Sequence, residues 1–240
     1  MDSWQGKNKA LTFSFDDGVL QDERAIGILD KYGLKATFNL NSGVFGTLNE
    51  HEWSGGTFRR DIVKKEDVKR IYEGHEVAVH TVSHPNLVNL SEEEIVAQVE
   101  NDRITLEDLV GYEVRMMAYP CGPVNSDERV AEIIKNRTKI RFARSYQSNG
   151  SFDLQDNLLL FSPTVYFVNV DEMYRLADKF FEIKTDKPQI FYIWGHTYEI
   201  DMAFAIDWKK FEEFCKYVSG KGDIFYGTNG QVFKRFITQW

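Results

Sequence analysis

The sequence lacks several features that would mark a membrane, nucleic-acid-binding or disulfide-stabilised protein. No run approaches 18 apolar residues, so no membrane insertion is expected. Basic residues number 29 against 37 acidic ones, a formal net charge of −8, which argues against the clustered cations that nucleic acids require. Cys121 and Cys215 are the only cysteines, and neither belongs to a CxxC pair. We therefore expect neither a disulfide framework nor a cysteine metal site.

The chain also lacks a recognisable leader, linker or repeat. The first residues, MDSWQGKNKALTF, contain no apolar stretch of about 7 to 15 residues before a small-residue cleavage site. A cytoplasmic protein is expected, and a secreted protein whose leader has been removed is the alternative. With 240 residues and only five scattered prolines, a single domain over residues 1–240 is predicted. The 42% hydrophobic and 14% aromatic content indicates a folded core rather than disorder. No feature selects an oligomeric state.

Short β-rich runs alternate with amphipathic helical patterns along the chain. The clearest helix begins after Ser91, which forms an SxxE capping box with Glu94, and it ends before Gly111. The predicted strands are 10–15, 35–40, 76–80, 114–119, 140–144, 158–168, 189–194 and 224–226, and segment 41–60 is predicted to be irregular. This layout favours a distorted (β/α) barrel of seven or eight parallel strands, with an open doubly wound sheet as the alternative.

Polar side chains lie where five of these strands end. They are Asp16 and Asp17 after the first strand, His80 and His84 at the third, Cys121 within 119–122 after the fourth, Arg144 at the fifth, and His196 after the strand that ends at Trp194. In a parallel barrel the carboxyl ends of the strands share one face, where catalytic groups gather. The sequence therefore predicts one active site at this face.

The HTVSH segment indicates a metal site. His80 and His84 are four residues apart, so one helical turn would direct both imidazoles to the same cation. A carboxylate from SFDDG would complete a two-histidine, one-carboxylate site with positions open for water or substrate. Asp16 and Asp17 can divide the work, one binding the cation and the other taking a proton from its water. A turn or helix cap is the alternative for this pair.

His196 is a third histidine at the same rim. A protonated imidazole opposite a metal-bound water suits a general acid for a departing amine or alcohol. Glu199 and Asp201 are the nominees for favouring its charged form. The alternatives for His196 are a third metal ligand and a hydrogen-bonding histidine of the core.

At these residues the sequence resembles the polysaccharide deacetylases, the NodB-homology or carbohydrate esterase family four enzymes. SFDDG at 14–18 resembles the family's TFDDG motif, and HTVSH at 80–84 matches its HxxxH motif. YPCG at 119–122 resembles the third motif, and WGH, which ends at His196, resembles the last one.

This resemblance implies a distorted barrel that binds one divalent metal, Zn²⁺ first and Co²⁺, Ni²⁺ or Mn²⁺ as alternatives. It also implies removal of acetyl groups, N-acetyl before O-acetyl, from an acetylated oligo- or polysaccharide. By motif position, the metal ligands are Asp17, His80 and His84, the general base is Asp16, the general acid is His196, and the main-chain N–H of Cys121 helps to hold the oxyanion.

Two positions depart from the family pattern. The third motif usually carries an arginine that pairs with the base aspartate, and Ala118 stands at that position. Arg144 is the replacement candidate, because it ends a neighbouring strand and a guanidinium can hold a carboxylate bidentately. Arg115 lies at the wrong end of its strand. The aromatic residue expected at Cys121 is also absent.

Two other functions stay open. One is hydrolysis of a non-sugar C–N bond on the same barrel. The other is carbohydrate binding without turnover, in which Trp53 and Phe58 of segment 41–60 would stack on sugar rings. A lid or packing loop is the alternative for that segment.

Overall fold

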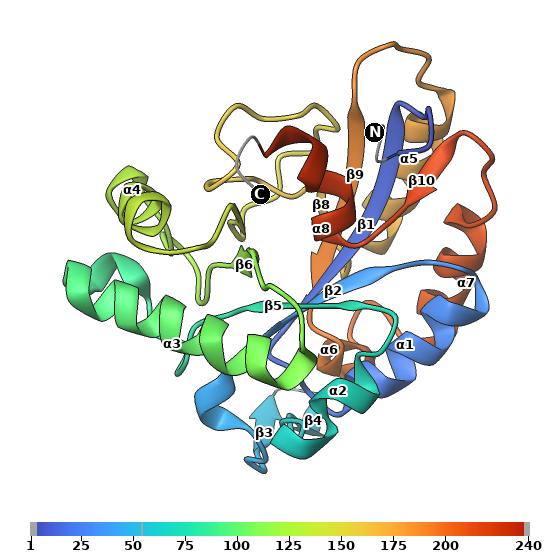
Figure 1. Ribbon diagram of the computed structural model, residues 1–240. Coiled ribbons are helices and arrows are strands. Elements are labelled where there is room, and N and C mark those ends of the chain that lie inside the picture. Colours follow the sequence, from blue (N-terminus) through green and yellow to red (C-terminus); the bar gives the residue numbers. More distant parts are fainter. Residues whose placement is uncertain (1–3, 54, 238–240) are drawn as a thin grey trace.

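The computed structural model describes residues 4–53 and 55–237, and its centre is a curled parallel sheet (Figure 1). The strands run in the order β7-β6-β5-β2-β1-β9-β8, and β10 pairs with the amino-terminal part of β1. All pairings between the named strands of this sheet are parallel. The strands are β1 Lys9–Asp16, β2 Ala36–Leu40, β5 Glu76–Val79, β6 Met116–Ala118, β7 Phe142–Arg144, β8 Val165–Tyr166, β9 Gln189–Gly195 and β10 Ile224–Tyr226. The predicted distorted barrel of seven or eight parallel strands is confirmed.

Helices cover the outside of this sheet (Figure 1), except the last one, Asn229–Phe233, which packs on the inner face, where Asn229 accepts a hydrogen bond from Thr12 of β1. They are α1 Gln21–Lys31, α2 Val68–Ile71, α3 Glu92–Val110, α4 Glu128–Arg137, α5 Val170–Glu182, α6 Tyr198–Met202, α7 Trp208–Val218 and α8 Asn229–Phe233. Helix α3 has the predicted capping box at Ser91 and Glu94, and the chain leaves it through Gly111 at φ +79°. Within the described part of the chain, no helix has the length and apolar character needed to cross a membrane.

The two faces of the sheet carry different cores. Along β1, Phe13 and Phe15 point outward, and both rings lie edge-on to Phe211 of α7. The alternate residues point into the barrel, where Ser14 accepts a hydrogen bond from Asn39 on β2. A strand with one apolar and one polar face therefore packs its helices outside and keeps its hydrogen-bonding groups inside.

Two segments differ from the prediction. The segment predicted to be irregular, 41–60, contains an antiparallel hairpin of β3 Glu50–Trp53 and β4 Gly56–Arg59. The single strand predicted over 158–168 is interrupted at Pro163, which has no N–H to continue a ladder. Before it, the Phe161 N–H donates to the carbonyl oxygen of Ala143 in β7; beyond it, β8 pairs with β9. This segment therefore links the two ends of the curled sheet.

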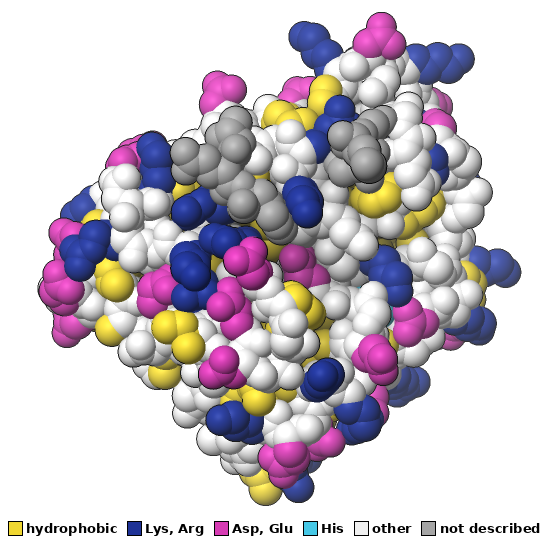
Figure 2. Space-filling view, in the orientation of Figure 1, with side chains coloured by type: hydrophobic (Ala, Val, Ile, Leu, Met, Phe, Trp, Pro, Cys, Tyr) yellow, Lys and Arg dark blue, Asp and Glu magenta, His cyan; other side chains and the backbone are white. Residues whose placement is uncertain are grey.

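The hairpin lies at the carboxyl-terminal end of β1, at the lower edge of Figure 1. Its foot, residues 60–63 directly after β4, is fixed to the loop that follows β1. The Val63 N–H donates to Gly18 at 2.9 Å, and the Leu20 N–H donates to Asp61 at 2.8 Å. Figure 2 shows acidic and basic side chains interspersed over one face of the molecule.

Candidate active site

The carboxyl ends of the strands surround a cavity of about 230 Å³. Six of the seven predicted site residues line it, and these are Asp16, Asp17, His80, His84, Cys121 and His196. The seventh, Arg144, lies behind Asp16 and is fully buried. The structure therefore brings all seven predicted residues together, from segments that span residues 16 to 196 of the sequence.

Asp17, His80 and His84 form a cluster whose ligand atoms all lie within 4.8 Å of one another. The Asp17 Oδ1 atom is 3.7 Å from Nε2 of His80 and 3.5 Å from Nε2 of His84. This oxygen is buried and has no hydrogen-bond partner within the described residues. A buried carboxylate oxygen without a partner costs free energy, and a divalent cation between it and the two imidazole nitrogens would remove that cost. The three atoms are therefore suited to hold such a cation.

The surroundings of both histidines favour the neutral imidazole, the form that can bind a metal ion. Nδ1 of His80 lies 2.9 Å from the carbonyl oxygen of Ala118, which can only accept, so this nitrogen carries the hydrogen and Nε2 keeps its lone pair. Burial lowers the pKa of His80 to about 4 and also lowers the pKa of His84. Burial opposes the charge of Asp17, but His196 and Arg60 outweigh it and lower the pKa of that carboxyl.

Asp16 is paired with Arg144 across the barrel interior. Nη2 of Arg144 contacts both carboxylate oxygens, at 2.5 Å from Oδ1, and Asn39 donates to Oδ1 at 2.8 Å. The Arg144 guanidinium also lies 4.4 Å from the ring centre of Trp194. Burial disfavours the Asp16 charge, but Arg144 and the neighbouring histidines lower its pKa. Asp16 is therefore held as a carboxylate.

His196 is paired with Glu199, three residues further along the chain. The Glu199 carboxylate accepts the His196 backbone N–H at 3.1 Å and lies 3.2 Å from its Nδ1. The other Glu199 oxygen accepts the Tyr166 hydroxyl. Burial opposes protonation of His196, but Glu199 and both site aspartates raise its pKa to about 9. The other nominee, Asp201, instead binds Gln21 and Trp208.

The loops of the site hold several residues in the left-handed region of backbone conformation. Asp17 has φ +83°, Thr81 +69°, His84 +60° and Cys121 +65°. This conformation costs a non-glycine residue about 1–3 kcal/mol and persists where surrounding contacts impose it. The Cys121 Sγ atom lies 3.6 Å from His84 Nδ1, and within the described residues its main-chain N–H has no hydrogen-bond acceptor.

Sequence reasoning missed three residues that shape the site. Asn39 donates to Asp16, and the buried Asp102 of α3 accepts the backbone N–H groups of His80 and Ser42 at 3.1 and 2.8 Å. Arg60, which follows the hairpin, reaches Asp17. Two of them left a signal in the sequence, since Asn39 is polar inside a buried strand and Asp102 is acidic on the buried face of α3. Arg60 belongs to a segment without a motif.

Aromatic side chains form the walls of the cavity. Tyr146, Trp194 and Tyr198 line it, and the Phe58 ring of the hairpin stacks on Tyr198 at 5.4 Å. Phe58 is thus partly engaged in packing the hairpin against α6. The side chain of Trp53, the other aromatic predicted to stack on sugars, lies outside the described residues.

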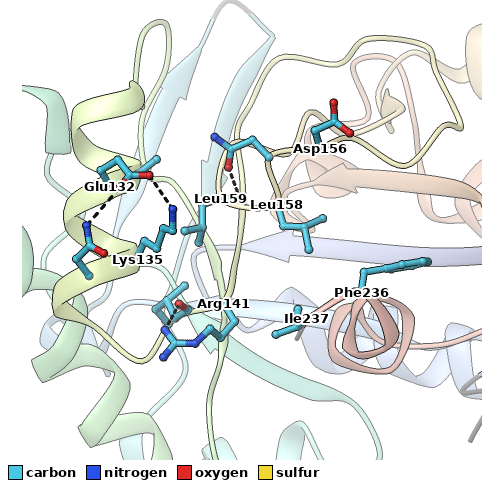
Figure 3. A pocket seen from close by; sticks show the side chains of 12 residues that line it. Glu132, Lys135, Arg141, Asp156, Leu158, Leu159, Phe236 and Ile237 are labelled. Atoms are coloured by element: carbon cyan, nitrogen blue, oxygen red, sulfur yellow. Dashed lines mark hydrogen bonds and ion pairs between the residues drawn. The ribbon is translucent and has the colours of Figure 1, made fainter. Parts of the chain in front are cut away.

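A larger cavity of about 630 Å³ lies at the amino-terminal end of β7, away from this site (Figure 3). Three of its charged side chains are already engaged, since Lys135 pairs with Glu132 and Arg141 donates to main-chain carbonyl groups. The cluster of Asp17, His80 and His84, which could hold a metal ion, belongs to the smaller cavity.

Comparison with known proteins matches residues 4–137 to the family model described as polysaccharide deacetylase. The peptidoglycan-N-acetylglucosamine deacetylase PgdA of Listeria monocytogenes is 32% identical over 131 residues, which are 53% of this chain and 24% of PgdA. The match therefore spans about a quarter of that relative's length.

Solved structures with the same fold cover most of the chain. The Xyl-CE4 domain of a multidomain xylanase from the hindgut metagenome of Trinervitermes trinervoides has a TM-score of 0.59 at 18% identity, over 95% of this chain and 92% of that one. A CE4 family pseudoenzyme from Bacillus anthracis has a TM-score of 0.54 at 16% identity, over 95% and 66% of the two chains.

Proposed function

Because the chain belongs to the polysaccharide deacetylase family, we propose that it is a metal-dependent hydrolase that removes acetyl groups from a carbohydrate. The observation that carries the proposal is the cluster of Asp17, His80 and His84, whose free carboxylate oxygen faces two neutral imidazoles. The negatively charged Asp16 and the positively charged His196 line the same cavity. Zn²⁺ is the proposed metal, with Co²⁺, Ni²⁺ and Mn²⁺ as alternatives.

A divalent cation held by these three ligands would supply Lewis-acid chemistry, polarising an acetyl carbonyl and acidifying water. Asp16 is the proposed general base. Its Oδ2 atom is engaged by Arg144, and since a carboxylate oxygen can accept two hydrogen bonds, it can still take a proton from an attacking water. Arg144 and Asn39 fix its orientation without protonating it.

His196 is the proposed general acid, which delivers a proton to the leaving group. The Glu199 carboxylate keeps its imidazole charged at neutral pH. An amide nitrogen leaves only after protonation, so a firmly protonated acid suits N-acetyl groups better than O-acetyl groups. The main-chain N–H of Cys121 is a proposed donor to the oxyanion, and a main-chain donor does not depend on which side chain stands there.

The substrate proposed is an acetylated oligo- or polysaccharide, and an N-acetylated glycan is favoured because a curated relative carries the name peptidoglycan-N-acetylglucosamine deacetylase. The cavity of about 230 Å³ is smaller than the roughly 300–1,000 Å³ that encloses a drug-sized ligand. The acetyl-bearing end of the glycan would therefore enter, and the rest of the chain would lie across the aromatic rim.

The test is acetate release from N-acetylglucosamine oligomers, peptidoglycan and acetylated xylan, using chelator-treated protein with and without Zn²⁺ or Co²⁺. We expect release that depends on metal. Asp16→Asn should bind metal as wild type does and lose about a hundred- to ten-thousandfold in turnover. Asp156→Asn, at the larger cavity, is the matched control and should be fully active.

Full activity of Asp16→Asn would contradict the assignment of the base. No release from any glycan by metal-loaded protein would contradict the deacetylase proposal. In that case, activity on small amides would support a non-sugar C–N hydrolase, and oligosaccharide binding without turnover would support an inactive binding protein, as the pseudoenzyme fold relative allows.

A further inference from the structure

Arg60 contacts the metal-ligand carboxylate from outside the barrel. Its Nη2 atom lies 2.8 Å from Oδ2 of Asp17, the oxygen that does not face the two histidines. Oδ1, which does face them, has no partner among the described residues. The two oxygens of one carboxylate are thus divided, one bound by a guanidinium and the other free to meet a cation.

The backbone next to Arg60 is tied to the loop that carries Asp17. The neighbouring Asp61 accepts the Leu20 N–H at 2.8 Å, and the Val63 N–H donates to Gly18 at 2.9 Å. Both bonds are made by residues just after β4, and they hold the hairpin's foot against residues 18–20. Arg60 therefore reaches Asp17 from a fixed backbone position.

The Arg60 guanidinium also packs on an aromatic ring. Its guanidinium carbon is 5.5 Å from the ring centre of Tyr198, and this ring stacks on Phe58 of β4. The side chain is 29% exposed, so it stands at the wall of the cavity and not in bulk solvent. A guanidinium that already packs on a ring loses little further freedom when it orients a carboxylate.

We propose that Arg60 is a positioning residue of the metal centre, which holds the Asp17 carboxylate so that Oδ1 faces His80 and His84. This inference rests on the proposed metal site and deepens it, because it makes cation affinity depend on the docked β3–β4 hairpin. Groups that orient metal ligands typically account for 10- to 100-fold in metal affinity. Arg60 would supply that effect from a segment that belongs to no strand or helix of the barrel.

The test is a titration of chelator-treated protein with Co²⁺ and Zn²⁺, in competition with a chromophoric chelator. We expect Arg60→Ala to raise the metal Kd about 10- to 100-fold and to change the visible spectrum of bound Co²⁺, which reports ligand geometry. Arg60→Lys should recover part of the affinity, since an ammonium can bind Oδ2 but cannot form the same planar contact.

Arg59→Ala is the matched control. Arg59 is the adjacent arginine of the same hairpin and pairs with Asp61, not with Asp17, so its loss should change the metal Kd by no more than about twofold. Arg60→Gln, which keeps an N–H donor, replaces Arg60→Ala if the alanine variant does not fold by circular dichroism.

An unchanged or lower metal Kd in folded Arg60→Ala would overturn the inference, and a lower one would identify Arg60 as a cation that competes with the metal. Equal weakening by Arg59→Ala would also overturn it, because the effect would then belong to the hairpin as a whole. Absence of metal binding by wild type would overturn the inference and the metal site together. If only the deacetylase proposal fails, the protein will still bind metal with an affinity that depends on Arg60, but it will release no acetate.

Discussion

Replacing Arg144 by methionine should destabilise the protein strongly, because it leaves the Asp16 charge buried without its partner. Arg144 is fully buried and Asp16 is 2% exposed. Removing one member of such a pair typically costs about 3–5 kcal/mol. Methionine fills much of the arginine's volume and can pack against Trp194, so the loss should reflect the unpaired charge more than an empty cavity.

The free energy of unfolding is measured by urea titration of chelator-treated protein, because a cation beside Asp16 would itself stabilise the charge. With a slope of about 2–3 kcal/mol per molar urea, the expected loss lowers the unfolding midpoint by roughly 1–2.5 M. Asp16→Asn alone should also destabilise, since it leaves the Arg144 charge unpaired. The double variant Asp16→Asn/Arg144→Met contains neither charge and should recover at least about 2 kcal/mol of the summed single losses.

The reasoning is refuted if the losses of the two single variants add in the double variant to within about 0.5 kcal/mol, because then the pair has no coupling energy. It is also refuted if Arg144→Met costs less than about 1 kcal/mol, a loss typical of an ordinary substitution. The double variant should stay inactive even where it is stable, which separates the structural role of the pair from the chemistry of Asp16.

The remaining predictions concern the groups around His196. Glu199→Gln removes the nearby negative charge that raises the His196 pKa, so the alkaline limb of the pH profile of kcat/KM should move to lower pH, by about one unit; an unmoved limb would exclude this pairing. Asp22 is buried, accepts hydrogen bonds from Tyr72 and Thr197, and has its pKa raised by burial to about 7. This pKa lies above the unfolded value near 3.9, so wild type loses stability as pH rises toward 7. The free energy of unfolding of Asp22→Asn, relative to that of wild type, should therefore rise by about 2–4 kcal/mol between pH 5 and pH 8 in urea titrations. A constant difference would show that Asp22 is ionised throughout.

The residues of the candidate site could be predicted because each lies in a short contiguous segment at or just after the end of a strand. Asp17 follows β1, and His80 follows β5, so strand periodicity alone brings them to one rim. The choice between Glu199 and Asp201 could not be made in this way. It depends on the short helix α6, whose first turn returns Glu199 to the His196 N–H and directs Asp201 toward Trp208.

Arg60 could not be predicted, because the interactions that place it leave no pattern in the sequence. The hairpin is short and largely exposed, and its foot is held by main-chain hydrogen bonds that any residue can make. The division of the strand predicted over 158–168 differs, because Pro163 marks it in the sequence. The partners of the two halves, β7 before Pro163 and β9 after it, depend on how the sheet closes.

The Arg144 contact shows how one change in a motif can be matched elsewhere in a barrel. Ala118, at the position where the third family motif usually has its arginine, is the register partner of Arg144 on the adjacent strand. The two residues are therefore at the same height in the barrel wall, and the small Ala118 side chain leaves interior space that the Arg144 side chain can cross to reach Asp16. The Ala118 carbonyl still holds His80, and this contact needs no side chain. The guanidinium can therefore come from the neighbouring strand while the backbone contact that orients His80 stays in place.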